Sequence, residues 1–131
     1  MPSLRSIVPL LLLAGLSFLN GCQNKPEQLG DANLAPASPQ DAAKIRQRYL
    51  QINPNNRLGV VVAVRAESNL AAVGDISVQD FGIGDVLTFI DSAEQPFNTG
   101  EVVNATPNAL HVKYDADRRA PREGDLAVRL R

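Results

Sequence analysis

Residues 110–130 read LHVKYDADRRAPREGDLAVRL. Apolar residues occupy every second position at both ends of this stretch, while its middle is polar and contains a proline. Strict alternation is typical of a β-strand with one buried and one solvated face, and the polar middle is typical of a hairpin loop. The stretch therefore predicts two half-buried strands, at 109–115 and 125–130.

Turn residues continue to separate short apolar runs back to Leu58, which predicts an all-β domain over residues 58–131. Residues 77–83 fit either a short strand or a single helical turn. The run GVVVAV at 59–64 is apolar on both faces, so we expect it to lie centrally or beneath a helix. We predict a mainly β fold, a small barrel of about six strands, with the four further strands at 59–65, 69–73, 86–91 and 101–105.

The two halves of this domain, residues 59–90 and 100–131, resemble each other. Each opens with Gly-x-Val-Val and reaches Gly-Asp before its last strand, with a one-residue gap between these anchors. The pattern predicts two copies of a strand–strand–turn–strand unit, through duplication or shared barrel geometry. Glycine tolerates a positive φ and aspartate can bind nearby backbone amides, so we expect both Gly-Asp pairs to be structural.

Residues 38–53 predict one amphipathic helix before the barrel. Ser38 suits the N-cap and Pro39 the first helical position. A helix of about 14 residues is too short to be stable alone, so it must dock on the barrel or on another molecule. Its basic flank, Lys44, Arg46 and Arg48, faces either solvent or anionic headgroups. The apolar stripe consists of Ala42, Ile45, Tyr49 and Ile52.

The first 21 residues have the features of a secretory signal, with Arg5 ahead of an apolar run at 7–19. That run is shorter than the roughly 20 residues that span a bilayer. It closes on Leu19, Asn20, Gly21 and Cys22, which resembles the lipobox of bacterial lipoproteins. The resemblance implies cleavage between Gly21 and Cys22, a diacylglyceryl group on the Cys22 thiol and an acyl chain on the new amine. The alternative is an ordinary secreted protein with a stray cysteine.

Residues 22–37 then form a lipidated flexible tether, because Pro26, Gly30 and Pro36 interrupt any period. Durable anchoring needs more than one acyl chain. The resemblance implies a cell-envelope protein attached to a membrane by its lipid. Gln23 stands where aspartate signals inner-membrane retention in many Gram-negative lipoproteins, which favours the periplasmic face of the outer membrane over the inner membrane.

Charge and composition exclude several other classes of protein. Without Arg5 the chain carries 12 basic and 14 acidic residues, which gives no reason to expect nucleic-acid binding. Acylation of the only cysteine leaves no thiol for a disulfide, a zinc-thiolate site or a cysteine nucleophile. The single histidine, His111, has no nucleophile context, and no phosphate loop, cofactor fingerprint or metal cluster is present. We therefore expect no enzyme and no cofactor beyond the lipid, although carboxylates could still meet in space.

Two regions remain as candidate binding sites. Residues 66–112 contain seven acids and no Lys or Arg, so Asp75, Asp80 and Asp85 could bind a cation or another ligand, although EF-hand spacing is absent. The loop 115–123 carries three arginines, which either contact an anionic envelope polymer or protein or simply face solvent. These possible partner contacts are Arg118, Arg119 and Arg122.

Four features of residues 58–131 together resemble the small SH3-like barrel modules of bacterial envelope proteins, such as the C-terminal domain of flagellar assembly protein T. They are an opening Gly-Val-Val-x-x-Val strand, Gly-Asp-Val-Leu at 84–87, a Gly-x-Val-Val strand at 100 and a closing Gly-Asp strand at 124. The resemblance implies a non-catalytic interaction or assembly module that binds an envelope protein or its own copies. That protein's extra N-terminal domains are missing, so no flagellar role is implied. The alternative topology is a cradle-loop barrel, whose duplicated halves also carry Gly-Asp turns.

Overall fold

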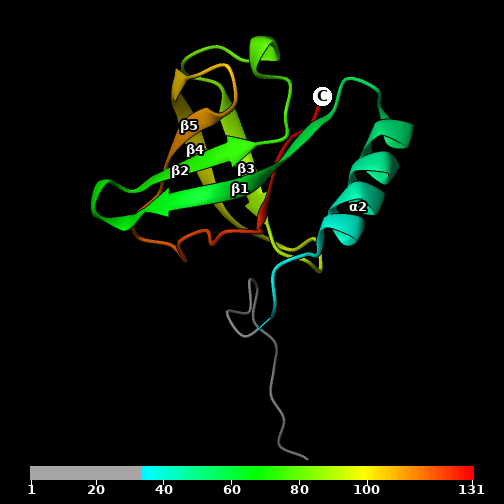
Figure 1. Cartoon of the computed structure of the whole chain (residues 1–131), viewed down its shortest axis with the longest axis horizontal. Helices are drawn as coiled ribbons and strands as arrows, with labels where there is room; N and C mark the ends of the chain where they lie inside the picture. Colours follow the sequence, from blue (N-terminus) through cyan, green and yellow to red (C-terminus); the bar gives the residue numbers. More distant parts are fainter. Residues whose placement is uncertain (1–33) are drawn as a thin grey trace, which may run out of the picture.

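The computed structural model describes residues 34–131, which fold into a closed antiparallel barrel of six strands preceded by one helix (Figure 1). The predicted fold class is therefore confirmed. The predicted signal peptide, Cys22 and residues 22–33 of the predicted tether lie outside the described residues. No helix among residues 34–131 is long and apolar enough to cross a membrane.

The predicted elements are present, with small shifts at their ends. The strand expected at 101–105 begins five residues earlier, at Pro96. A proline is tolerated there because the first strand position does not require an N–H. Residues 77–83 contain a single helical turn rather than a strand. The elements are α2 (Pro39–Ile52), β1 (Arg57–Arg65), η2 (Ala66–Ser68), β2 (Leu70–Gly74), η3 (Val78–Asp80), β3 (Val86–Ile90), β4 (Pro96–Ala105), β5 (Leu110–Tyr114) and β6 (Leu126–Arg129).

The strands follow the order β1-β2-β5-β4-β3-β6 around the barrel. β5 lies between β2 and β4, whereas β6 lies between β3 and β1. The hairpin expected between the last two strands is therefore wrong, because β5 and β6 pair with other strands. Their connection runs across one end of the barrel instead (Figure 1).

The sequence repeat corresponds to two equivalent halves of the barrel. Exchanging β1 with β4, β2 with β5 and β3 with β6 leaves the strand order unchanged. A register shift follows Val61 in β1 and Val102 in β4, the equivalent positions of the two halves. This relation agrees with the two strand–strand–turn–strand units that the sequence repeat predicts.

The Gly-Asp turns join the two halves to each other. The Gly84 N–H donates to Val102 O and the Val102 N–H to Asp85 O, both at 2.8 Å. In the other half, the Gly124 N–H donates to Val61 O at 2.9 Å and the Val61 N–H to Asp125 O at 2.8 Å. Gly84 has φ +97° and Gly124 has φ +94°, a backbone conformation that residues with a side chain rarely adopt. The expectation of a structural role for both pairs is confirmed.

The interior of the barrel is filled with apolar side chains. Phe89 is the largest fully buried side chain, and its ring centroid lies 6.3 Å from that of Phe97. Close packing of this kind leaves the outer surface as the place for contacts with other molecules. The buried members of this interior cluster are Val61, Ala71, Val73, Leu87, Phe89, Phe97, Val102, Leu110, Val112, Tyr114 and Ala127.

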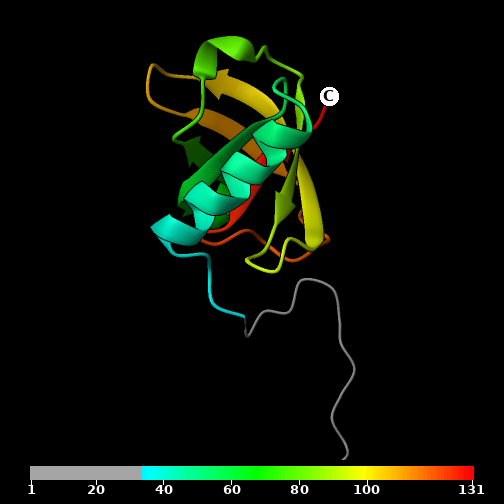
Figure 2. The same cartoon turned by 90° about the vertical axis from the view of Figure 1, so that its right-hand side faces the viewer.

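The helix α2 docks on the outside of the barrel, as expected (Figure 2). The Ser38 hydroxyl accepts from the Asp41 N–H at 3.1 Å, which confirms the predicted N-cap. Ile45 packs in a second apolar cluster with β1, β3 and β6. Ile52, predicted in the same stripe, is 76% exposed because the helix ends beyond the surface that it covers. The buried members of the cluster are Ala42, Ile45, Leu58, Ile90, Leu126 and Val128.

Two arginines of the predicted basic flank bind the barrel. Arg46 Nη2 donates to Leu58 O at 3.3 Å, to Asp75 O at 3.0 Å and to Asp75 Oδ2 at 2.9 Å. Arg48 Nη2 donates to Glu94 Oε2 at 2.6 Å. The flank therefore helps to hold α2 in place, in addition to the apolar contacts below it.

Candidate functional site

The three arginines predicted as partner contacts lie at one end of the barrel. We call it the loop end, because the connection 115–125 and the turn 91–95 meet there. Arg118 is exposed. The Arg119 guanidinium lies 3.8 Å from the centroid of the Phe97 ring and its side chain is 18% exposed, a cation–π arrangement that holds it against the barrel. Arg122 Nη2 donates to Leu34 O at 2.6 Å.

A buried amide holds the connection in its path across the barrel. Asn98 in β4 is 1% exposed. Its Nδ2 donates to Asp115 O at 3.0 Å and to Arg119 O at 2.9 Å. Its Oδ1 accepts from the Thr99 N–H at 2.7 Å and from the Asp115 N–H at 3.3 Å. One side chain thus satisfies four backbone groups, and no signal in the sequence identifies it.

A fully buried carboxylate lies under the arginines. Asp125 Oδ2 accepts from the Arg122 N–H at 2.7 Å and from Arg119 Nη2 at 3.5 Å. Asp125 Oδ1 and Arg119 Nη1 are buried and make no hydrogen bond within the described residues. Burial raises the pKa of the Asp125 carboxyl above its ordinary value of 3.8, against the lowering effect of the Arg122 N–H and the two guanidinium charges.

This raised pKa predicts how stability depends on pH. Folded Asp125 holds its proton more tightly than the unfolded chain does, so protonation favours the folded state between the ordinary and the raised pKa. Relative to Asp125→Asn, which cannot titrate, the natural chain should gain stability as the pH falls from about 7 to about 4. Urea unfolding of both proteins at each pH measures this. A constant difference, or one of opposite sign, would contradict the assignment.

The residues just before α2 are fixed to the loop end, although the sequence predicts a flexible tether there. We call residues 34–37 the strap. Besides the bond from Arg122 to Leu34, Ser92 Oγ donates to Ala35 O at 2.8 Å. Pro36 packs so closely on Gly124 that a Cβ added there would lie 2.6 Å from Pro36 Cβ. The last four residues of the predicted tether therefore belong to the folded domain.

A hollow of about 490 Å³ lies beside these arginines. The Phe97 ring and polar groups of β3 and β4 form its walls, with Arg118 and Arg119 at one side. This lining can hold a flat or anionic group but carries no acid–base pair. The lining residues are Thr88, Pro96, Phe97, Asn98, Thr99, Arg118 and Arg119.

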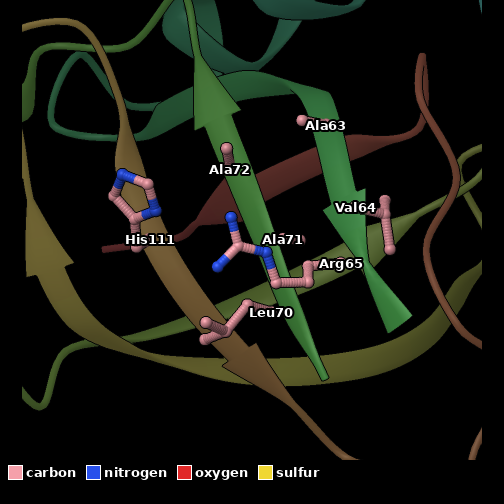
Figure 3. A pocket seen from close by; sticks show the side chains of 7 residues that line it. All are labelled: Ala63, Val64, Arg65, Leu70, Ala71, Ala72 and His111. Carbon is pink, nitrogen blue, oxygen red and sulfur yellow. The ribbon is translucent and has the colours of Figure 1, made fainter. Parts of the chain in front are cut away.

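His111 lies on the outer face of the barrel, beside a smaller pocket of about 230 Å³ (Figure 3). It pairs with Ala72 across β2 and β5, and its imidazole and the Arg65 guanidinium flank a floor of small apolar residues. No hydroxyl, thiol or carboxylate side chain lines the pocket within the described residues, so His111 has no partner there for proton transfer.

The acidic residues considered for cation binding are in ion pairs with arginines. Asp75 contacts Arg46 at 2.9 Å, Asp80 contacts Arg57 at 2.7 Å and Asp85 contacts Arg129 at 3.4 Å. Residues 34–131 hold no group of three His, Cys, Asp or Glu that could bind a metal. The paired arginines lie far from these aspartates in the sequence, so the sequence did not predict that the aspartate charges are neutralised. The arrangement favours a structural role for these aspartates.

Together the described residues define the class of fold: a small closed β-barrel with an apolar, filled interior and one helix docked on its outside. Comparison with protein-family models, curated proteins and solved structures found no match to this chain. Its function is therefore inferred from its own residues and contacts.

Proposed function

We propose that this chain is a lipid-anchored protein of the bacterial cell envelope whose barrel is a non-catalytic interaction or assembly module. The observation that carries the proposal is the sequence Leu19-Asn20-Gly21-Cys22 behind an apolar run and shortly before the folded domain. Two or more acyl chains on Cys22 attach the mature chain to a membrane, with the periplasmic face of the outer membrane favoured over the inner membrane.

The strap supports a defined point of attachment between the anchor and the barrel. Cys22 precedes Leu34 by twelve positions, so even a fully extended chain keeps the anchor within about 43 Å of Leu34. The Leu34 carbonyl is bound by Arg122 at the loop end. The tether from the anchor therefore joins the folded domain at the loop end, and Arg118 is exposed there.

The filled interior supports a role through surfaces rather than through an internal site. Leu87, Phe89 and Leu110 occupy the inside with no exposed area, so a ligand has no space within the barrel. Partners of this module are an envelope protein or further copies of the chain. The resemblance of residues 58–131 to envelope SH3-like modules points the same way.

Cell fractionation of the Cys22→Ser variant tests the anchor. We expect the natural chain in the membrane fraction and Cys22→Ser largely outside it, because the variant lacks the thiol that receives the diacylglyceryl group. Asn24→Ser is the matched control, since it changes a neighbouring residue and keeps the cysteine; it should stay with the membrane. A natural chain that is not in the membrane fraction, or a Cys22→Ser chain that remains there, would contradict the proposal.

A further inference from the structure

The four most exposed large apolar side chains of the described residues lie at one end of the molecule. They are Ile52 at 76%, Ile83 at 70%, Leu130 at 60% and Val86 at 55% exposed, and we call them the far patch. Ile52 ends α2, Val86 begins β3 and Leu130 follows β6, all opposite the loop end. Exposed apolar residues that gather in this way mark interaction surfaces more often than scattered ones do.

The sheet part of the patch is continuous. β3 and β6 pair Thr88 with Val128, so two residues further along Val86 lies opposite Leu130. Ile83 lies in the Gly-Asp turn that leads into β3. That turn is bound to the end of β6, because Arg129 Nη1 donates to Asp80 O at 2.8 Å and to Asp85 Oδ2 at 3.4 Å.

The helix part adjoins it. Asn53 Nδ2, at the residue after Ile52, donates to Arg131 O at 2.7 Å, and the Arg131 N–H donates to Asn56 Oδ1 at 2.9 Å. The end of α2 is therefore tied to the residue that follows Leu130. Ile52 lies seven positions after Ile45, so both lie on the same face of the helix.

Charges around the patch are largely neutralised within the chain. Arg57 pairs with Asp80 at 2.7 Å and Arg129 with Asp85 at 3.4 Å. Arg131 and Glu101, which pairs with Val86 across β3 and β4, are exposed and of opposite sign. Two identical surfaces of this kind do not repel each other, so the charge pattern suits a second copy of the chain.

We propose that the far patch is the interface between two copies of this chain, a proposal that deepens the assembly role given above. In a two-fold pair, Ile52 of one copy packs on Val86 and Leu130 of the other. Within one chain, Ile45 already packs in the same manner with Ile90 and with apolar residues of β6. The far patch lies further along the same helix, α2, and the same strand pair, β3 and β6. There the chain itself covers neither the helix residue nor the strand residues.

Sedimentation equilibrium of the full chain, extracted in mild detergent, tests the interface. We expect a dimer, and we expect Ile52→Glu to weaken it at least about tenfold, because a charge would be buried without a partner. Leu50→Glu is the matched control: it adds the same charge to a 39% exposed leucine of the same helix and should leave the dimer unchanged. A monomeric natural chain, or a dimer that tolerates Ile52→Glu, would overturn the proposal.

Crosslinking in cells that make an Ile52→Cys copy together with a Leu130→Cys copy distinguishes the possible occupants of the patch. A disulfide between the two copies supports the proposal. A disulfide to another protein in place of one between the copies, or no disulfide at all, would overturn it. Cell fractionation distinguishes failure of the interface from failure of the lipid anchor. The Ile52→Glu variant keeps Cys22, so it should remain with the membrane whether or not it dimerises.

Discussion

Replacing Phe89 with alanine is expected to lower the free energy of unfolding by about 3–5 kcal/mol. The ring has no exposed area, lies in the interior cluster and contacts Phe97, so its loss removes apolar burial and leaves a cavity. Domains of this size are stable by only about 5–15 kcal/mol, so the variant should lose a large part of its stability. Urea unfolding followed by circular dichroism measures the change.

Val62→Ala is the matched control for this prediction. Val62 lies in β1, outside the far patch, and is 50% exposed, and an exposed truncation should change stability by no more than about 0.5 kcal/mol. Equal losses in the two variants would show that the barrel interior is not packed around Phe89.

Replacing Asn98 with alanine should have the second largest effect, a loss of about 2–4 kcal/mol. The change leaves the carbonyls of Asp115 and Arg119 and the N–H groups of Thr99 and Asp115 without the partner that the amide provides. Asp115 and Arg119 belong to the connection across the loop end. We therefore also expect amide exchange in this connection to be faster in Asn98→Ala than in the natural chain, with a smaller increase in β1.

Thr99→Ala serves as the control for Asn98, since Thr99 is its exposed neighbour in β4. It should leave both stability and exchange nearly unchanged. An Asn98→Ala protein as stable as the natural chain would contradict the assigned role of the amide.

Alternation of apolar residues was sufficient to place the strands. The clearest patterns, at 110–114 and 126–129, correspond to β5 and β6. The expectation of one solvated face holds for β5 but is wrong for β6, because Ala127 lies in the barrel interior and Leu126 and Val128 lie under α2. The pairing of these strands could not be read from the same pattern. Alternation indicates which face is buried, whereas strand order depends on contacts between residues far apart in the sequence.

The loop end was predicted less completely than the barrel. The sequence identified Arg118, Arg119 and Arg122 as a group but not the buried Asp125 that two of them contact. It also assigned residues 34–37 to a tether, because composition alone does not reveal a backbone carbonyl bound by Arg122. Contacts of this kind join residues up to 88 positions apart.

Ile52 shows how a helical pattern can be right while its consequence is wrong. Its spacing from Ile45 places it on the apolar face of α2, yet the barrel surface below that face ends before it. Helical periodicity determines direction around the axis and not how far the partner surface extends. This difference is the origin of the far patch.

The proposed function depends first on Cys22 being the lipid-bearing first residue of the mature chain. The most direct test is the intact mass and N-terminal peptide of the natural protein extracted from membranes. We expect a chain that begins at Cys22 and carries a diacylglyceryl group together with an acyl chain on its amine. A chain that retains residues 1–21, or one that begins elsewhere with an unmodified Cys22 thiol, would contradict it.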